Sequence, residues 1–222
     1  DGYAVIGMDK DAEGLQAITE AAKPLSLSIT CMVLDVADET QVVQSMALAF
    51  ERLGPLDALA TCAGVVNATP FGELSVKDFQ QTYNTNVVGT FLCIREAAKY
   101  MTQGSRICTI GSVAGMRGGE LFGTAAYAAS KGAVLALTKS AARALANKGI
   151  SVNCVVPGPT QTPMIEAMWL DENKRAIVES ASLQKRAASP DELACSVAFL
   201  LSSQASNISG STLVSDGGIM MY

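Results

Sequence analysis

The sequence predicts a doubly wound α/β domain, in which helices cover both faces of a parallel sheet. Two observations support this prediction: short apolar runs alternate with helical stretches along the 222 residues, and these runs are apolar on both faces. Because connections between parallel strands are almost always right-handed crossovers, the alternation favours a Rossmann-like, three-layer α/β/α arrangement. No linker or internal repeat interrupts it, so we expect residues 1–222 to form one domain.

Strands are expected where apolar, β-favouring residues cluster between turn residues. The expected strands span 3–8, 28–34, 56–62, 106–110, 150–156 and 211–214. Helices are expected where apolar residues recur at the helical period, as they do at Val42, Val43, Met46 and Phe50. The expected helices span 10–22, 38–53, 75–101, 125–147 and 190–202. Strand and helix therefore alternate along the chain, as a parallel sheet requires.

Histidine is absent from the sequence, which excludes several classes of site. Without it the chain has no Ser-His-Asp or Cys-His catalytic pair, no His-ligated zinc and no imidazole acid or base. The six cysteines are widely spaced and include no C-x-x-C, so they resemble neither a zinc site nor a disulfide framework. We therefore expect no metal, reduced and buried thiols, and a cytoplasmic location.

The surface charge is mildly acidic, with 16 Lys and Arg against 21 Asp and Glu. No cluster of basic residues is present, which argues against nucleic acid or an anionic membrane as the main partner. No apolar run approaches the roughly 18 residues of a membrane span, and no signal peptide opens the sequence. If the chain is an enzyme, its proton transfer must come from Tyr, Lys, Cys, Asp or Glu.

Tyr127 and Lys131 stand four residues apart on the expected helix 125–147, so their side chains share one face. A phenol normally titrates near pH 10, and a neighbouring ammonium favours the phenolate, which would lower the pKa of Tyr127. The spacing alone is common by chance. Ser112, however, follows the strand 106–110 at its carboxyl end, where open α/β sheets bind ligands and a hydroxyl can stabilise charge on a carbonyl oxygen.

Seven segments resemble, in the expected order, the motifs of the short-chain dehydrogenase/reductase family. They are Asp35-Val36, Ala63-Gly64, Asn86-Val-Val-Gly89, Ser112, Tyr127-x-x-x-Lys131, Pro157-Gly-Pro-Thr-Gln-Thr162 and Ile208-Ser-Gly…Asp216-Gly-Gly218. Each match is weak by itself, but chance does not readily produce seven in register. The resemblance covers essentially the whole chain.

The resemblance implies a role for each of four candidate catalytic residues. Tyr127 would exchange a proton with the substrate oxygen, and Lys131 would lower its pKa and hold the nicotinamide ribose. Ser112 would orient and polarise the substrate oxygen, and Asn86 would hold a water molecule of the proton relay. The hydride itself would pass between the substrate and a nicotinamide cofactor.

The resemblance also implies where the cofactor binds. Asp9 matches the position that contacts the adenosine ribose, where a carboxylate accepts from both hydroxyls and repels a 2′-phosphate, so NAD is expected over NADP. Asp35 and Val36 would border the adenine, and Thr160 and Thr162 would bind the carboxamide end. The remaining expected cofactor-binding residues are Cys62, Ala63, Gly64, Tyr127, Lys131, Pro157 and Gly158.

The chain departs from the family pattern in three places. First, Thr61-Cys62-Ala63-Gly64 stands where family members usually have Asn-Asn-Ala-Gly. Second, Tyr127 follows Ser112 by 15 positions, slightly more than usual, and the loop between them contains Gly118, Gly119 and Gly123. The glycine-rich phosphate loop, which joins the family's first strand and helix, has no counterpart. We expect an additional N-terminal βα unit of roughly 25–30 residues in the functional protein, with its strand between 3–8 and 57–62.

Residues 163–190 match the family's substrate-capping segment. Met164, Met168, Trp169 and Leu183 within it are typical either of ordinary amphipathic helix packing or of an apolar, adaptable pocket wall. They do not identify a substrate.

The helices 75–101 and 125–147 carry small residues that permit close helix–helix approach, and in the family these helices pair across a two-fold axis. We therefore expect a homodimer or homotetramer. The expected activity is that of an NAD(H)-preferring alcohol dehydrogenase or carbonyl reductase. The alternatives are a non-catalytic dinucleotide-binding or interaction protein, which the missing phosphate loop favours, and dehydratase or epimerase chemistry on a related fold.

Overall fold

The computed structural model describes residues 2–119 and 124–221, except for the side chains of Ala167 and Met168. Its strands are β1 (Val5–Asp9), β2 (Ile29–Val33), β3 (Leu56–Thr61), β4 (Met101–Ile110), β5 (Ser151–Pro157) and β6 (Thr212–Ser215). All pairings between them are parallel: β1 pairs with β2, and a second sheet has the order β3-β4-β5-β6. The predicted parallel α/β architecture is thereby confirmed.

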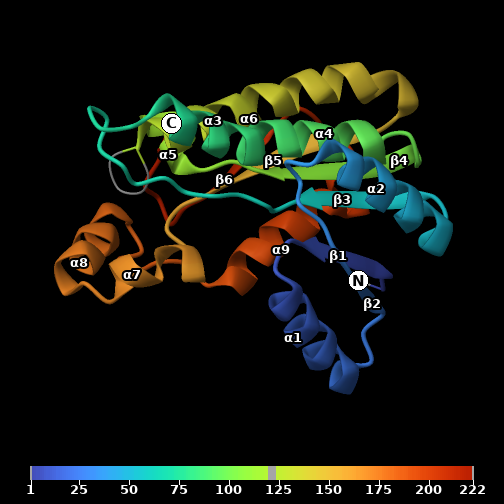
Figure 1. The fold of residues 1–222 in the computed structure, drawn as a ribbon, viewed down its shortest axis with the longest axis horizontal. Helices are drawn as coiled ribbons and strands as arrows, with labels where there is room; N and C mark the ends of the chain where they lie inside the picture. Colours follow the sequence, from blue (N-terminus) through green and yellow to red (C-terminus); the bar gives the residue numbers. More distant parts are fainter. Residues whose placement is uncertain (1, 120–123, 222) are drawn as a thin grey trace.

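Helices cover both faces of the larger sheet (Figure 1). In Figure 1, α2, α4 and α6 lie above the sheet and α9 lies below it, which gives the predicted three layers. The helices are α1 (Ala12–Ala22), α2 (Glu39–Leu53), α3 (Val76–Tyr83), α4 (Gly89–Ala97), α5 (Val113–Arg117), α6 (Ala125–Leu145), α7 (Glu166–Trp169), α8 (Glu172–Ala181) and α9 (Pro190–Leu201).

The core lies in two layers, one on each side of the sheet. Ile107 of β4 and Val152 of β5 pack with residues of α2, α4 and α6, whereas Cys108 packs with Leu193 and Leu200 of α9. Successive residues of a strand point to opposite faces, so Ile107 and Cys108 contribute to different layers. Burial on both faces explains why Ile107-Cys108 in β4 and Cys154-Val155-Val156 in β5 are runs of consecutive apolar residues.

β1 has an outer edge in the smaller sheet, and β3 has an outer edge in the larger one. Among the described residues, no strand pairs with either edge. The hydroxyl oxygen of Thr61, at the end of β3, is buried and has no hydrogen-bond partner in the described part of the chain. These features agree with a strand between 3–8 and 57–62, which stays a prediction.

The predicted helix 75–101 is wrong in its continuity and its end. It consists of α3, a π-helical turn at Asn84–Val88 and α4, which ends at Ala97. β4 already begins at Met101, and its pairing with β3 shifts register between Leu56↔Met101 and Ala58↔Arg106. Gly104 lies within this irregular stretch at φ 90°, a conformation that glycine adopts without steric cost.

Three helices were not predicted: α5, α7 and α8. α5 and α7 are too short for the helical period to show in the sequence. α8 begins at a signal that the sequence does carry, because the Asp171 side chain accepts from the backbone N–H groups of Asn173 and Lys174. Of the glycines expected in the loop before Tyr127, Gly123 lies outside the described residues.

Candidate active site

Tyr127 and Lys131 lie on the buried face of α6, with 8% and 5% of their surface exposed. The Lys131 Nζ atom is 5.8 Å from the centroid of the Tyr127 ring, so the two side chains share one face as predicted. Lys131 also donates a hydrogen bond of 2.9 Å from Nζ to the carbonyl oxygen of Ile110. This bond fixes the lysine against the carboxyl end of β4.

Ser112 joins this pair from the start of α5. Its Oγ accepts a hydrogen bond of 3.1 Å from the backbone N–H of Ala114, which caps the helix, and its hydroxyl is close enough to the Tyr127 phenol to lower the pKa of that group in part. α5 packs closely on α6 at Gly115, where an added Cβ would lie 2.6 Å from the backbone nitrogen of Gly132. A side chain at position 115 would therefore separate the helices that carry Ser112 and Tyr127.

Asn86 lies in the π-helical turn and is 1% exposed. Its Oδ1 accepts from the backbone N–H of Val65 at 2.8 Å, and its Nδ2 donates to the Val65 carbonyl and to the Ser130 hydroxyl, both at 2.9 Å. Ser130 in turn donates to the carbonyl of Tyr127 at 2.7 Å. The Asn86 side chain thus braces the loop after β3 against α6, and the water-holding role expected of this residue stays a prediction.

A small cradle is present at Gly64 in the loop after β3. An ideal Cβ at this position would lie 3.4 Å from Asn86 Oδ1 and 3.5 Å from Lys131 Nζ. A larger residue would fill the space beside the lysine, so the glycine keeps it open for a ligand. Cys62 is exposed two residues earlier and interacts electrostatically with Lys131.

The electrostatics of the site differ from the expectation for Tyr127. Burial raises the pKa of the Tyr127 phenol above its usual value, although the hydrogen bond from Ser112 lowers it in part. Burial also lowers the pKa of Lys131 to about 8. The predicted lowering of the tyrosine pKa is therefore wrong for this chain, because the loss of solvent around the phenol dominates. At neutral pH, Tyr127 is a neutral phenol and Lys131 is mainly an ammonium.

Asp9 and Asp35 lie together at the ends of β1 and β2. The backbone N–H of Leu34 donates to the Asp9 carbonyl at 2.9 Å, which joins the two strand ends. The carboxylates cap the following turns: Asp9 Oδ1 accepts from the Asp11 N–H at 3.0 Å, and Asp35 Oδ1 accepts from the Ala37 N–H at 2.9 Å.

Val36 packs against α4. An added Cβ at Gly89 would lie 2.6 Å from the Val36 Cγ2 atom, so this valine already fills the space over the helix. Its side chain therefore has a packing contact in addition to the predicted place beside an adenine.

The segment after β5 begins next to Ser112. The N–H of Gly111 donates to the Val155 carbonyl at 2.8 Å, which holds the ends of β4 and β5 side by side. Beyond Pro157 and Gly158, Thr160 donates from Oγ1 to the Gly158 carbonyl at 3.1 Å. Thr162 donates from Oγ1 to the Thr160 carbonyl at 3.4 Å. Both threonine hydroxyls keep acceptor capacity for a bound ligand.

The site fits part of a dinucleotide. The cradle at Gly64 beside Lys131 and the threonines after β5 suit its nicotinamide end, and Asp9 suits its adenosine ribose. The sequence has no glycine-rich turn to bind the phosphates between these ends. Within residues 2–119 and 124–221, no cluster of three Cys, Asp or Glu side chains is arranged to hold a metal ion. No helix described there is long and apolar enough to cross a membrane.

Two features of the site were not predicted. Ser130 links the Asn86 side chain to α6. The sequence carries a signal for this role, because positions 127, 130 and 131 share one face of the expected helix. An ion pair between Arg186 and Glu192 fixes the segment before α9. No motif marks it in advance, since the two residues meet only where the chain turns into the helix.

Comparison with known proteins places the chain in a family. A family model described as enoyl-(acyl carrier protein) reductase matches residues 1–220. A short-chain dehydrogenase/reductase of Armillaria gallica is 38% identical over 84% of this chain and 74% of its own length. A 3β-hydroxysteroid dehydrogenase of Mediterraneibacter gnavus is 33% identical over 100% of this chain and 87% of its own length.

A solved structure supports the same assignment. It is a short-chain dehydrogenase from Burkholderia cenocepacia in complex with NADP, with a TM-score of 0.89 and 31% identity over 99% of this chain and 88% of that one. The fold, the motifs and the full-length family match agree with one another. The chain therefore belongs to the short-chain dehydrogenase/reductase family of NAD(P)-binding oxidoreductases.

Proposed function

We propose that this protein is a dehydrogenase or reductase that moves a hydride between NAD(H) and a secondary alcohol or ketone. The observation that carries the proposal is the convergence of Ser112, Tyr127 and Lys131: the serine hydroxyl influences the pKa of the phenol, and the ammonium lies 5.8 Å from the centroid of the ring. All three are buried at the carboxyl end of β4, where parallel sheets bind their ligands.

The proposed chemistry divides between the residues and the cofactor. A bound nicotinamide supplies or accepts the hydride. In the direction of reduction, Tyr127 donates its proton to the substrate oxygen, and in oxidation its phenolate accepts the proton from the alcohol. Ser112 donates a hydrogen bond to the same oxygen while negative charge develops on it. The Lys131 ammonium stabilises the phenolate that remains, which its location beside the ring allows.

Asp9 supports a preference for NAD over NADP. Its carboxylate is exposed at the end of β1, where two ribose hydroxyls can donate to it and a 2′-phosphate is repelled. Lys10 follows directly, so the preference depends on which of the two side chains faces the ribose. We expect Asp9→Asn to weaken the binding of NADH more than that of NADPH.

Residues 163–190 are the proposed cover of the substrate. Met164 and Leu183 are 48% and 64% exposed there, which leaves apolar side chains free to contact a ligand. The 3β-hydroxysteroid dehydrogenase among the relatives supports an apolar secondary alcohol as the substrate class.

A homodimer or homotetramer is proposed on the exposed apolar residues of α4. Phe91 is 43% exposed on this helix, and Val88 just before it is 36% exposed. Apolar side chains exposed on one helix are typical of a contact between subunits.

Two experiments test the proposal. The first is a fluorescence titration of the protein with NADH and with NADPH. The second is a screen of NAD-linked oxidation across hydroxysteroids, polyols and simple secondary alcohols. We expect saturable binding, tighter for NADH, and turnover of at least one secondary alcohol. Saturable binding without turnover of any of them would favour a non-catalytic dinucleotide-binding protein. The absence of saturable binding would contradict the proposal and favour an interaction protein that retains the fold.

A further inference from the structure

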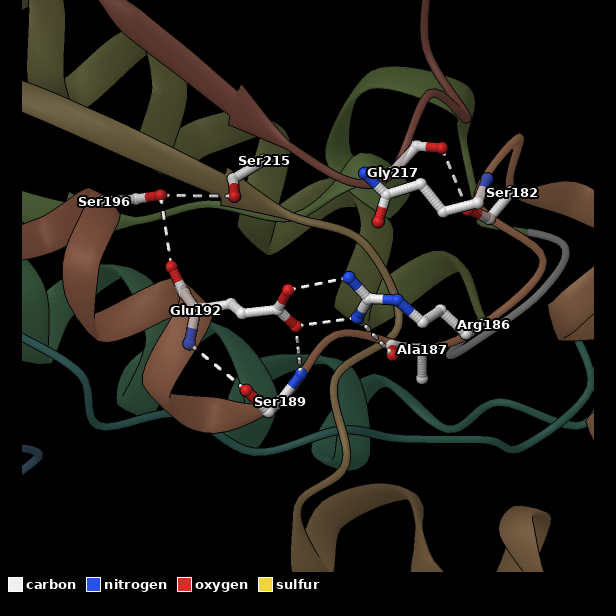
Figure 2. A network of polar contacts seen from close by, with 9 residues as sticks. Ser182, Arg186, Ala187, Ser189, Glu192, Ser196, Ser215 and Gly217 are labelled. Carbon is white, nitrogen blue, oxygen red and sulfur yellow. Dashed lines mark hydrogen bonds and ion pairs between the residues drawn. The ribbon is translucent and has the colours of Figure 1, made fainter.

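The segment that connects α8 to α9, residues 182–189, is anchored on the turn that follows β6 (Figure 2). Ser182 donates from Oγ to the Gly217 carbonyl at 2.9 Å, and the backbone N–H of Gln184 donates to the same carbonyl at 3.3 Å. Gly217 has a φ of 68°, and an added Cβ there would lie 2.5 Å from Ser182 Oγ. The first half of the segment is therefore fixed by close contact with this turn.

Its second half is fixed on the loop after β5. The backbone N–H of Ala188 donates to the Pro159 carbonyl, and the N–H of Gln161 donates to the Ala188 carbonyl, both at 2.9 Å. Thr160 and Ala188 thereby form a parallel β-bridge. Because Thr160 lies inside this bridge and Thr162 two residues beyond it, the location of Ala188 determines where both threonine hydroxyls lie.

An ion pair brackets Ala188 on both sides. The two terminal nitrogens of Arg186 each donate to one carboxylate oxygen of Glu192 at 2.7 Å, and Figure 2 shows the two groups facing each other. Glu192 Oε2 also accepts from the backbone N–H of Ser189 at 2.8 Å, while Ser189 Oγ caps α9. One carboxylate thus holds the residue two positions before Ala188 and the residue directly after it.

The pair contributes little to overall stability but defines local geometry. Both side chains are about half exposed, and solvent screens an exposed ion pair so that it adds little to the free energy of unfolding. A bidentate guanidinium–carboxylate contact is nevertheless specific in direction. The Arg186 guanidinium and the Ser189 amide lower the pKa of Glu192 to about 2, so the pair stays charged throughout the neutral range.

We propose that the Arg186–Glu192 pair positions the cofactor-binding threonines, by holding Ala188 in its bridge to Thr160. Arg186 and Glu192 are positioning residues in this proposal, since they act through Ala188 and not on the reacting atoms. The proposal rests on the proposed function, because Thr160 and Thr162 matter only if they bind the carboxamide end of the cofactor. It predicts that loss of the pair weakens cofactor binding more than it slows turnover.

Glu192→Gln is the test variant, because glutamine keeps the shape and can still accept from Ser189 but loses the charge. The matched control is Glu20→Gln, which breaks the exposed pair with Lys23 at the end of α1, outside the proposed site and its covering segment. For Glu192→Gln we expect a KM for NADH about 10-fold higher and a kcat within roughly 3-fold of the wild type. Glu20→Gln should leave both unchanged. Arg186→Met should match Glu192→Gln, and the double variant should be no worse than either.

Amide hydrogen exchange tests the same claim without turnover. The N–H groups of Ala188 and Gln161 form the bridge, and we expect both to exchange faster in Glu192→Gln but not in Glu20→Gln. Unchanged exchange in Glu192→Gln would overturn the proposal, whatever happens to KM. A lower unfolding midpoint together with a kcat that falls as much as the KM for NADH rises would overturn it too, because it would show a general structural role. A wild type that binds neither nucleotide would contradict the proposed function, and faster exchange alone would then show a structural bridge and overturn the cofactor-positioning role.

Discussion

Lys131 loses nearly all contact with solvent, and this loss lowers the pKa of its ammonium to about 8. The folded state therefore binds fewer protons than the unfolded state between pH 8 and the ordinary lysine value of 10.5. In that window, stability rises with pH. Below pH 8 the fold bears the full cost of the buried charge, which the proposed role of the ammonium beside the phenol would explain.

We expect Lys131→Met to remove this cost. The variant should be more stable than the wild type, by the largest margin at pH 7. The difference between their free energies of unfolding should shrink by about 2–3 kcal/mol as pH rises from 8 to 10.5. Urea unfolding at a series of pH values measures it, with Lys139→Met on the exposed side of the same helix as the control. A difference that does not change with pH would contradict the buried ammonium.

The composition of the catalytic group could be predicted from the sequence, but its hydrogen-bond partners could not. Tyr127 and Lys131 are linked by helix spacing, and Ser112 is linked to them by the strand end that precedes it. The partners of Asn86 are Val65 and Ser130, which lie 21 and 44 positions away, so only the fold brings them together. The rise in the pKa of Tyr127 likewise depends on burial, which spacing does not give.

The contact between α5 and α6 is the element-scale feature on which the site depends most. Gly115 lies at the crossing, and an added Cβ would be 2.6 Å from backbone atoms of both Lys131 and Gly132. Backbone atoms cannot rotate away as a side-chain end can. The two helices would have to separate, and with them Ser112 and Tyr127.

We expect Gly115→Ala to destabilise the protein by about 1–3 kcal/mol, because the helices cannot absorb the extra methyl group without moving apart. Gly72→Ala is the matched control, since no heavy atom lies within 4 Å of a Cβ built there. Urea unfolding of both variants measures the effect. Equal stability of the two variants would show that the helices do not meet as closely as described.

The strands were easier to predict than the helices. A strand buried on both faces is rich in consecutive apolar residues, and all six predicted strands overlap observed ones. The helix predicted over 75–101 joined α3, the π-helical turn and α4. The spacing of apolar residues in the sequence does not reveal a single turn that contains one extra residue. The short α5 and α7 depend on tertiary packing, which a periodic pattern does not contain.

At the scale of the whole molecule, the predicted layers are confirmed, and two of its edges remain available for pairing. β1 and β3 each have an edge with which no strand pairs among the described residues, and the buried Thr61 hydroxyl lacks a partner there. Both observations favour the predicted additional strand at this place. The homo-oligomer is a second prediction at this scale, because it concerns the outer face of α4.

We expect the mass in solution to be a two- or four-fold multiple of the 23.0 kDa chain. Phe91→Glu should yield monomers, since it puts a charge into the proposed apolar contact. Phe71→Glu, at a phenylalanine that is 83% exposed away from α4, is the matched control and should leave the assembly intact. Sedimentation equilibrium measures all three proteins, and a monomeric wild type would contradict the proposal.

The most direct test of the account is proton transfer by Tyr127, measured in the variant Tyr127→Phe. With NADH and the ketone that corresponds to an alcohol identified by the screen, we expect kcat/KM to fall by about 10²–10⁴-fold while the affinity for NADH is retained, because only the transferable proton is lost. Tyr100→Phe, whose ring stacks on Phe50 outside the site, should keep full activity. Undiminished turnover by Tyr127→Phe would contradict the account.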